Sequence, residues 1–180
     1  MSRIHVVELS TATPEQKVLL EAIQKQVGMV PNFLKVFANS PAALQAFLGL
    51  HGIASAGSLD PLDRERIALT LAQQNGCQYC VSAHTAIGRK TGLSDEEMAA
   101  AREGTSEDPT SAAILKFARS LMARHGEISA LELTEVRSAG VDEAQIVEVI
   151  THVGMNFLTN ILGKASLVEI DFPSVKLELA

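Results

Sequence analysis

Apolar residues recur at helical spacing along almost the whole chain, and turn-forming residues separate the repeats. Leu44, Phe47, Leu48 and Leu50, for example, fall on one side of a helix. The pattern predicts an all-α domain with eight or nine helices and short loops. The expected helices span residues 14–27, 31–38, 41–56, 61–75, 77–90, 94–102, 109–126, 129–140 and 142–163, and only 4–9 and the tail after 168 resemble extended segments.

Helix-start signals support these boundaries. A capping residue followed three positions later by Glu or Gln can satisfy the free backbone groups of the first turn. This pattern occurs at Thr13 with Gln16, Ser94 with Glu97, Ser129 with Glu132 and Asp142 with Gln145. A weak similarity between 44–60 and 114–129 suggests two loosely related helical halves. Because no linker or change of composition interrupts the chain, we expect one domain over residues 1–180.

The composition and net charge argue against several classes of protein. The chain is 47% hydrophobic and 4% aromatic, with a net charge of −6. The negative charge argues against binding to nucleic acid or an anionic membrane. No apolar run approaches the roughly 18–20 residues that cross a bilayer, and no secretory leader opens the chain. Two cysteines are too few for a disulfide-rich secreted scaffold. We therefore expect a soluble, cytoplasmic protein with no nucleic-acid or membrane partner.

The two cysteines share a predicted helix with a histidine. At about 100° per residue, Cys77, Cys80 and His84 fall within roughly 60° of one another. The Asn75-Gly76 stop places Cys77 in the first turn, where free backbone N–H groups and the helix dipole favour a thiolate. His84 lies one turn beyond Cys80 and can accept its proton or stabilise its anion.

Glu65 joins this group if the chain reverses at Asn75-Gly76. The two helices then run antiparallel, and residue 84 returns about 10 Å, to within roughly one turn of Glu65. A carboxylate there could orient His84 and accept its second N–H. The predicted order of the proton relay is Cys80, His84, Glu65.

Two neighbouring thiols suit peroxide reduction. A thiolate attacks the O–O bond and becomes a sulfenic acid, and the second thiol condenses with it to form a disulfide. An external dithiol then reduces the disulfide by exchange. We favour Cys80 as nucleophile and Cys77 as resolving partner because His84 is within reach of Cys80, although the helix terminus favours Cys77. Reduction of another protein's disulfide would use the same atoms.

These residues resemble the AhpD-like alkylhydroperoxidases of the carboxymuconolactone decarboxylase superfamily. The family signature is Glu, eleven residues, then Cys-x-x-Cys-x-x-x-His, matched here by Glu65, Cys77, Cys80 and His84. Similarity to the peroxidase-related branch extends to residues 28–32, the helix that starts at Ser40-Pro41, and 152–160. One departure is Tyr79, because several members have a second histidine just before the second cysteine.

The resemblance implies an all-helical fold assembled as a trimer or hexamer. It also implies peroxide reduction by the two cysteines, a relay through His84 and Glu65, and no bound metal or other cofactor. In some members a lipoyl-bearing protein supplies the electrons. Members that lack the cysteines are lactone decarboxylases.

Other interpretations remain open at this stage. The cysteines could be half of a zinc site, but zinc needs four ligands and only His84 is locally placed to join them; they could also be buried core residues. His152 could line the pocket beside Asn156 or be an interior histidine, and Tyr79 could border the thiols. Besides a peroxidase, the sequence permits a protein-disulfide reductase that regenerates a separate peroxidase, or a non-catalytic redox-sensing oligomeric module.

Overall fold

The computed structural model describes residues 2–178, and within that range it contains nine helices and no β-strand. The all-α prediction is confirmed. The helices are α1 (Pro14–Val27), α2 (Asn32–Phe37), α3 (Pro41–Ala54), α4 (Pro61–Gln74), α5 (Gln78–Thr91), α6 (Asp95–Glu103), α7 (Pro109–Ala123), α8 (Ala130–Ser138) and α9 (Glu143–Ser166). The two segments expected to be extended, 4–9 and the tail after 168, have no regular secondary structure in their described parts.

The predicted capping boxes are all present, at the N-termini of α1, α6, α8 and α9. Several predicted ends differ by one to three residues, and two of these differences lie at the cysteines or at the helix that covers them. Cys77 is the N-cap of α5 rather than part of its first turn, because Gly76 has a φ of 66° and the chain reverses there. Helix α9 continues past Gly163 to Ser166 and ends at Leu167, whose φ is 45°. Gly163 therefore has another role than ending the helix.

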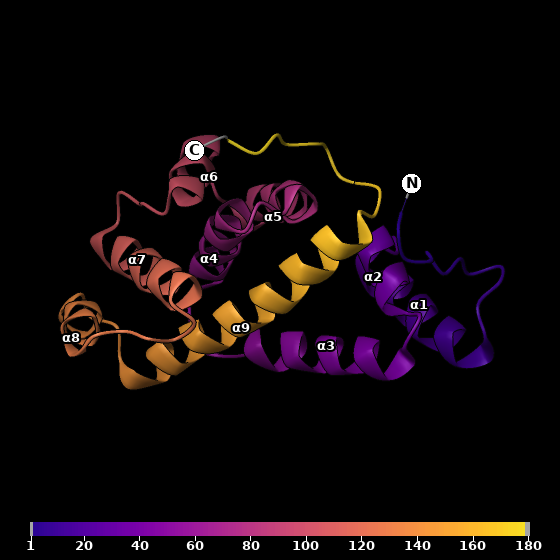
Figure 1. The fold of residues 1–180 in the computed structure, drawn as a ribbon, viewed down its shortest axis with the longest axis horizontal. Helices are drawn as coiled ribbons and strands as arrows, with labels where there is room; N and C mark the ends of the chain where they lie inside the picture. The colour runs from indigo at the N-terminus through magenta and orange to yellow at the C-terminus, as the bar shows by residue number, and fades with distance from the viewer. Residues whose placement is uncertain (1, 179–180) are drawn as a thin grey trace.

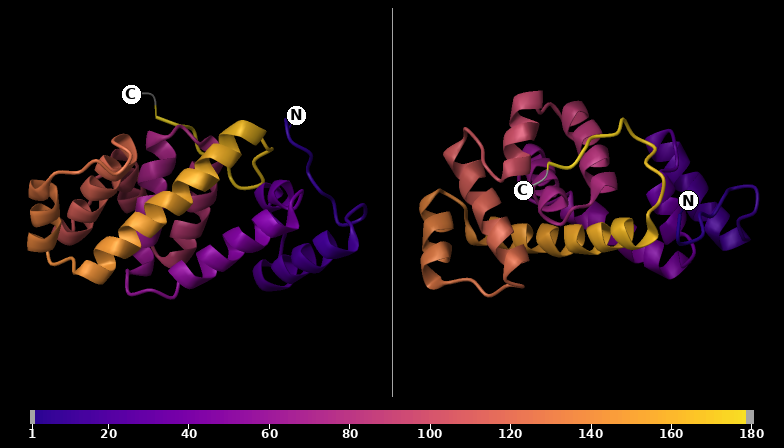
Figure 2. Two further views of the ribbon diagram at one scale, coloured as in Figure 1. Left: turned by 60° about the horizontal axis from the view of Figure 1, so that its bottom comes forward. Right: turned by 45° about the horizontal axis from the view of Figure 1, so that its top comes forward.

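Helix α9 runs diagonally across the molecule, and Figure 1 shows the other helices arranged around it and α4. Helix α4 contacts α5, α6, α7 and α9, while α9 also contacts α3, α5 and α7. The turned views in Figure 2 show α3 beside α9 and the C-terminal segment passing over α5. The helices proposed as related halves, α3 and α7, both pack against α9 and are each followed by a newly capped helix.

The core forms two clusters of buried apolar side chains. One gathers residues of α4, α6, α7, α8 and α9, and the other gathers residues of α1, α2, α3 and α5 with the two terminal segments. Cys77 and Cys80 belong to the second cluster. Helix α4 contributes Leu69 to the first cluster and Ala72 to the second. The redox pair is therefore attached to the helix that joins the two halves of the core.

The segment after α9 is held along α5 by specific hydrogen bonds. Tyr79 Oη donates to Asp171 Oδ1 at 2.8 Å, and the Val175 backbone N–H donates to Ser82 Oγ at 3.0 Å. Farther along, Gln73 Nε2 donates to the Glu178 carbonyl at 2.8 Å. The bonds of Tyr79 and Ser82 hold the segment against the N-terminal half of α5, and the bond of Gln73 holds it against the end of α4.

By length and composition, α9 alone among the described helices could cross a membrane, with a mean hydropathy of 1.2 over an 18-residue window. As expected, no uninterrupted apolar run of that length occurs in it, because Thr, His, Asn and Gly residues separate the apolar ones. About 44% of the window is buried inside the protein. The helix packs against α3, α4, α5 and α7.

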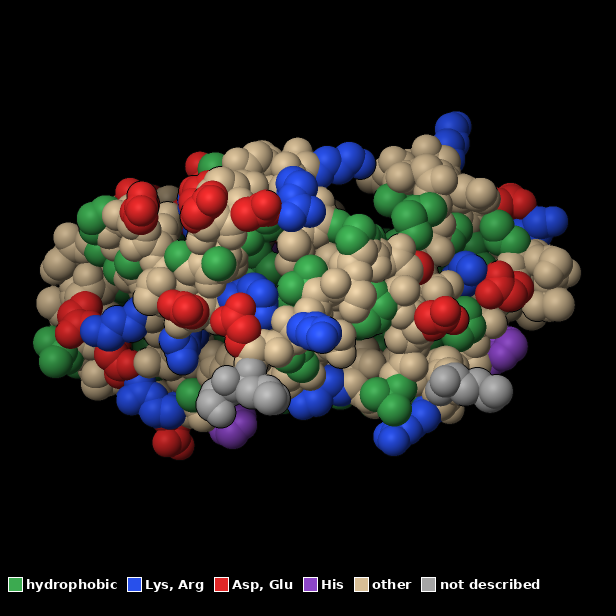
Figure 3. Space-filling view, turned by 90° about the horizontal axis from the view of Figure 1, so that it is seen from above, with side chains coloured by type: hydrophobic (Ala, Val, Ile, Leu, Met, Phe, Trp, Pro, Cys, Tyr) green, Lys and Arg blue, Asp and Glu red, His purple; other side chains and the backbone are tan. Residues whose placement is uncertain are grey.

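The surface seen from above carries acidic and basic side chains interspersed, with apolar side chains between them (Figure 3). Several opposite charges are paired across helices, for example Lys116 with Glu135 at 2.6 Å and Lys35 with Glu8 at 3.0 Å. Such exposed pairs contribute little to stability individually.

Candidate active site

Cys77 and Cys80 form a disulfide, with their Cα atoms 5.3 Å apart. The pair lies where the chain reverses between α4 and α5. Cys77 caps α5, and its Sγ accepts a hydrogen bond from the Cys80 backbone N–H at 3.3 Å. In the reduced state, this donor at a helix N-terminus would favour a thiolate on Cys77. The predicted placement of both sulfurs on one side of the helix is confirmed.

The disulfide is buried beneath α9. Cys77 is 1% and Cys80 is 4% exposed. The Thr159 carbonyl oxygen lies 4.0 Å from Cys80 Sγ. A Cβ atom added at Gly163 would lie 2.8 Å from Cys77 Sγ, closer than normal packing allows. Gly163 is thus the residue that lets the α9 backbone approach the sulfurs, and its lack of a side chain serves packing.

Glu65 and His84 meet across α4 and α5, as the antiparallel arrangement predicts. Glu65 Oε2 lies 2.8 Å from His84 Nδ1, and both side chains are mostly buried. A carboxylate on Nδ1 fixes the ring's orientation and leaves Nε2 to exchange a proton. Within residues 2–178, His84 makes no hydrogen bond to either sulfur; a disulfide has no proton to donate to it. The structure thus joins the four residues singled out in the sequence as two pairs, Cys77 with Cys80 and Glu65 with His84, and α5 carries Cys80 and His84 one turn apart.

Tyr79, between the cysteines, is directed away from them. Its Oη donates to Asp171 and accepts a hydrogen bond from the Phe33 backbone N–H at 3.3 Å. Burial and the neighbouring Asp171 carboxylate raise the pKa of the Tyr79 phenol well above its usual value. The phenol therefore stays protonated and anchors α5 to α2 and the C-terminal segment, rather than bordering the sulfurs.

Two further histidines lie near this region. His152 of α9 is 3% exposed and its buried Nε2 has no hydrogen-bond partner among the described residues. Burial lowers the pKa of His152, so the ring is neutral near pH 7. Burial, and next the positive charge that His84 can carry, lower the pKa of His51 on α3. His152 is thus an interior histidine, as one of the two sequence interpretations proposed.

Sequence reasoning missed the contribution of α9 to the surroundings of the sulfurs. Its inner face carries buried polar side chains at positions 152, 156 and 160, spaced four residues apart in an otherwise apolar helix. Thr159 and Gly163 on the same helix approach the sulfurs directly. The four-residue spacing of the polar residues was the available signal, because a buried polar group needs a partner or a function.

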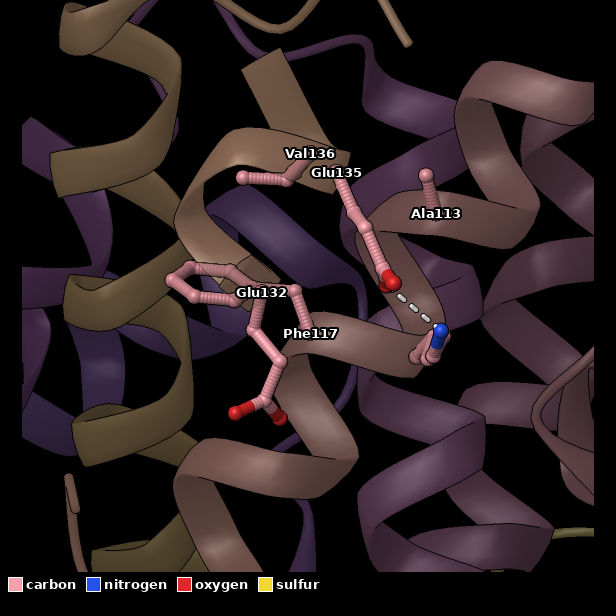
Figure 4. Close-up of a pocket in the computed structure, with 6 residues that line it drawn as sticks. Ala113, Phe117, Glu132, Glu135 and Val136 are labelled. Atoms are coloured by element: carbon pink, nitrogen blue, oxygen red, sulfur yellow. Dashed lines mark hydrogen bonds and ion pairs between the residues drawn. The ribbon is translucent and has the colours of Figure 1, made fainter. Parts of the chain in front are cut away.

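A groove of about 570 Å³ lies between the end of α4 and the second half of α9, and neither cysteine lines it. It is lined by Gln74, Asn75, Phe157, Asn160, Ile161, Lys164 and Ala165. A second cavity, between α7 and α8, has a volume of only about 20 Å³. The ion pair of Lys116 and Glu135 is part of its lining (Figure 4). Because none of its lining residues belongs to α4, α5 or α9, we do not connect it with the redox pair.

The described side chains of residues 2–178 contain no group of three or more His, Cys, Asp or Glu that could hold a metal ion. The cysteines are bonded to each other, and His84 is engaged by Glu65.

Comparison with known proteins agrees with the fold. Residues 41–123, which span α3 to α7, match the carboxymuconolactone decarboxylase family. A peroxidase-related protein from Silicibacter sp. TM1040 superposes with a TM-score of 0.80 at 26% identity, covering 94% of both chains. The AhpD-core, peroxidase-related protein from Ralstonia eutropha JMP134 gives 0.82 at 23% identity, covering 94% of this chain and 92% of its own.

Residues 41–123 thus resemble this family, and the chain shares the AhpD-like fold of the two peroxidase-related proteins. The same fold occurs in the debrominase Bmp8, solved with 2,3,4-tribromopyrrole, at a TM-score of 0.78, 19% identity and coverage of 95% of this chain and 92% of that one. A search of curated proteins found no significant match. Proteins of this fold are thus named for different activities, and the reaction must be argued from the site.

Proposed function

We propose that the protein is a dithiol peroxidase that reduces hydroperoxides through a cycle of Cys77 and Cys80. The observation that carries this proposal is the disulfide between these residues beside the Glu65–His84 pair. The similarity to a peroxidase-related protein supports it. The different activity named for Bmp8 concerns a protein of only 19% identity.

In the proposed reaction, the reduced Cys80 gives its proton to His84 and attacks the terminal peroxide oxygen. The S–O bond forms as the O–O bond breaks, and the leaving alkoxide takes the proton from His84. Cys77 then attacks the sulfenic sulfur, the disulfide forms and water leaves. Two thiols are oxidised while one peroxide is reduced to an alcohol and water. An external dithiol, for which a lipoyl-bearing protein is one candidate, restores the thiols by exchange.

His84→Ala should shift the pH midpoint of thiol alkylation upward by about one to two units, because the thiolate loses its cationic partner. The measurement is the rate of iodoacetamide alkylation of the reduced protein from pH 5 to 10. His5→Ala, an exposed histidine on the N-terminal segment, is the control and should leave the profile unchanged. An unchanged profile in the His84 variant would remove this residue from the relay.

We also propose that the protein self-associates in the cytoplasm through α3 and the first half of α9. These neighbouring helices carry exposed apolar side chains: Leu50 and Ile53 on α3, and Val147 and Ile150 on α9, from 38% to 78% exposed. An exposed apolar surface of this kind is typical of protein–protein contacts. Sedimentation equilibrium of the protein and of Ile53→Asp tests the assembly, for which a trimer or hexamer is expected.

The test of the proposed function is steady-state loss of hydrogen peroxide and of cumene hydroperoxide with dithiothreitol or dihydrolipoamide as reductant. Consumption that depends on protein concentration supports a peroxidase. Reduction of a protein disulfide without peroxide loss would instead identify a disulfide reductase. A change of assembly on oxidation without either turnover would identify a redox sensor.

A further inference from the structure

Three segments that are distant in sequence meet at one carboxylate beside the turn that carries the cysteines. Asp171 accepts a hydrogen bond on each of its oxygens, from the Tyr79 hydroxyl at 2.8 Å and from the Asn32 backbone N–H at 2.6 Å. Tyr79 Oη in turn accepts a hydrogen bond from the Phe33 backbone N–H at 3.3 Å. Hydrogen bonds to a charged carboxylate are among the stronger ones in proteins. The start of α2 and the segment after α9 are therefore both attached to the side chain at position 79.

Tyr79 extends this attachment to the cysteines because it lies between them in the chain. Cys77 is the N-cap of α5, and the first turn of the helix contains Tyr79 and Cys80. Tyr79 is 7% exposed, and its ring packs against Phe33 and Phe172, with ring centroids 5.6 and 5.8 Å away. Since both the ring and the hydroxyl are held, the backbone of this turn cannot rotate without breaking the contacts of Tyr79.

The contacts that hold the turn do not depend on the S–S bond. The hydrogen bonds and ring contacts of Tyr79 include no sulfur atom, so they stay available when the disulfide is reduced. The α9 backbone also limits movement of the sulfurs, because a Cβ added at Gly163 would lie 2.8 Å from Cys77 Sγ and 3.4 Å from Cys80 Sγ. The reduced pair is thus confined between α9 and a turn that Tyr79 fixes.

We propose that Tyr79 and Asp171 are positioning residues for the redox pair, because their hydrogen bond keeps the first turn of α5 in the reduced protein in the arrangement that lets Cys77 and Cys80 bond. The apparent equilibrium constant for closing the disulfide falls with the fraction of reduced molecules in that arrangement. In the oxidised protein the disulfide itself holds the turn, so loss of the hydrogen bond frees only the reduced state.

As a step of peroxide turnover, this inference rests on the proposed function, since the same disulfide closes in every cycle. The dithiol–disulfide equilibrium is nevertheless measured without a peroxide. The measurement is equilibration with mixtures of reduced and oxidised dithiothreitol, followed by alkylation of the free thiols and mass spectrometry of the whole protein.

Tyr79→Phe should shift this equilibrium toward the dithiol about 3- to 10-fold, because the hydroxyl is lost while the ring contacts stay. This shift corresponds to a reduction potential about 15–30 mV higher. Asp171→Ala should give at least as large a shift. The double variant should shift no further than Asp171→Ala alone, because both changes remove the same hydrogen bond.

Gln73→Ala is the matched control. Gln73 Nε2 donates to the Glu178 carbonyl at 2.8 Å, so this variant loosens the same C-terminal segment at its attachment to α4 and leaves the contacts of Tyr79 in place. It should keep the wild-type equilibrium. Thermal unfolding of the oxidised and reduced forms adds a second readout, since a merely structural role of Tyr79 would lower Tm equally in both and leave the potential unchanged.

The outcomes separate this inference from the proposed function. Shifts in Tyr79→Phe and Asp171→Ala, with a wild-type potential in Gln73→Ala, support the positioning role, and Tyr79→Phe decides alone if Asp171→Ala does not fold. An unchanged potential in Tyr79→Phe, or an equal shift in Gln73→Ala, overturns this role and leaves the peroxidase function standing. Absence of peroxide loss by the wild-type protein overturns the peroxidase function, while the potentials still decide the positioning role.

Discussion

Cys80→Ser should abolish peroxide turnover while leaving the helical content and the assembly unchanged. The serine hydroxyl is far less nucleophilic than a thiolate at neutral pH, and without Cys80 no intramolecular disulfide can form. The buried side chain, 4% exposed, is replaced by one of similar size, so the packing should be kept. Loss of the disulfide should lower the free energy of unfolding only modestly, because the bond closes a very short loop. The measurements are peroxide loss with dithiothreitol, circular dichroism and sedimentation.

Cys77→Ser is the companion variant that identifies the attacking sulfur. If Cys80 attacks first, this variant should still form one equivalent of sulfenic acid with a single addition of peroxide, trapped by dimedone on Cys80. Cys80→Ser should then give no adduct. The reverse pattern would make Cys77 the nucleophile. The hydrogen bond that Cys77 Sγ accepts from the Cys80 N–H at the helix N-terminus would favour a thiolate there. Turnover retained in Cys80→Ser would contradict the proposed cycle.

The sequence predicted the arrangement of the four candidate residues because local rules determine it. The Asn75-Gly76 stop reverses the chain, the helical period aligns Cys80 with His84, and the antiparallel return brings His84 to Glu65, with Oε2 and Nδ1 2.8 Å apart. Each step depends on residues close in sequence. The roles of the four residues in turnover stay predictions.

The parts that the sequence did not predict depend on distant segments. Nothing near Gly163 indicates that it will face Cys77, 86 positions earlier, so a helix end was the natural interpretation of an isolated glycine there. Tyr79 is similar, because Asp171, which accepts a hydrogen bond from its hydroxyl, lies 92 residues farther along the chain. The groove likewise forms only when the end of α4 meets α9. Tertiary contacts of this kind leave no periodic signal in the sequence.

Arg66→Met should lower the free energy of unfolding by about 3 kcal/mol. Arg66 is 8% exposed and donates to Asp63 at 2.8 Å and to Glu97 at 2.7 Å, and Ser111 also donates to Asp63 at 2.7 Å. Without the guanidinium, the Asp63 carboxylate, itself 8% exposed, stays buried with only the Ser111 hydroxyl. Thermal unfolding should show Tm lowered by about 6–12 °C for a chain of this length.

Two further variants isolate the charge effect. Arg66→Met combined with Asp63→Asn removes both charges and should recover part of the lost stability, because the penalty comes from the unpaired buried carboxylate. Arg137→Met breaks an exposed pair with Glu143 and should leave Tm unchanged. If Arg66→Met and Arg137→Met have the same Tm, the buried network does not stabilise the fold.

The same network also bears on the candidate site. Asp63 and Arg66 bind α4 to α6 and α7, whereas Glu65, between them in sequence, points to His84 on α5. The ion pairs therefore fix the rotation of α4 about its axis and, with it, the direction of the Glu65 carboxylate. Below its lowered Tm, Arg66→Met should consequently show a reduced kcat that the double variant partly restores. Full activity of Arg66→Met below its Tm would show that the ion pairs of Arg66 are not needed to orient the Glu65 carboxylate toward His84.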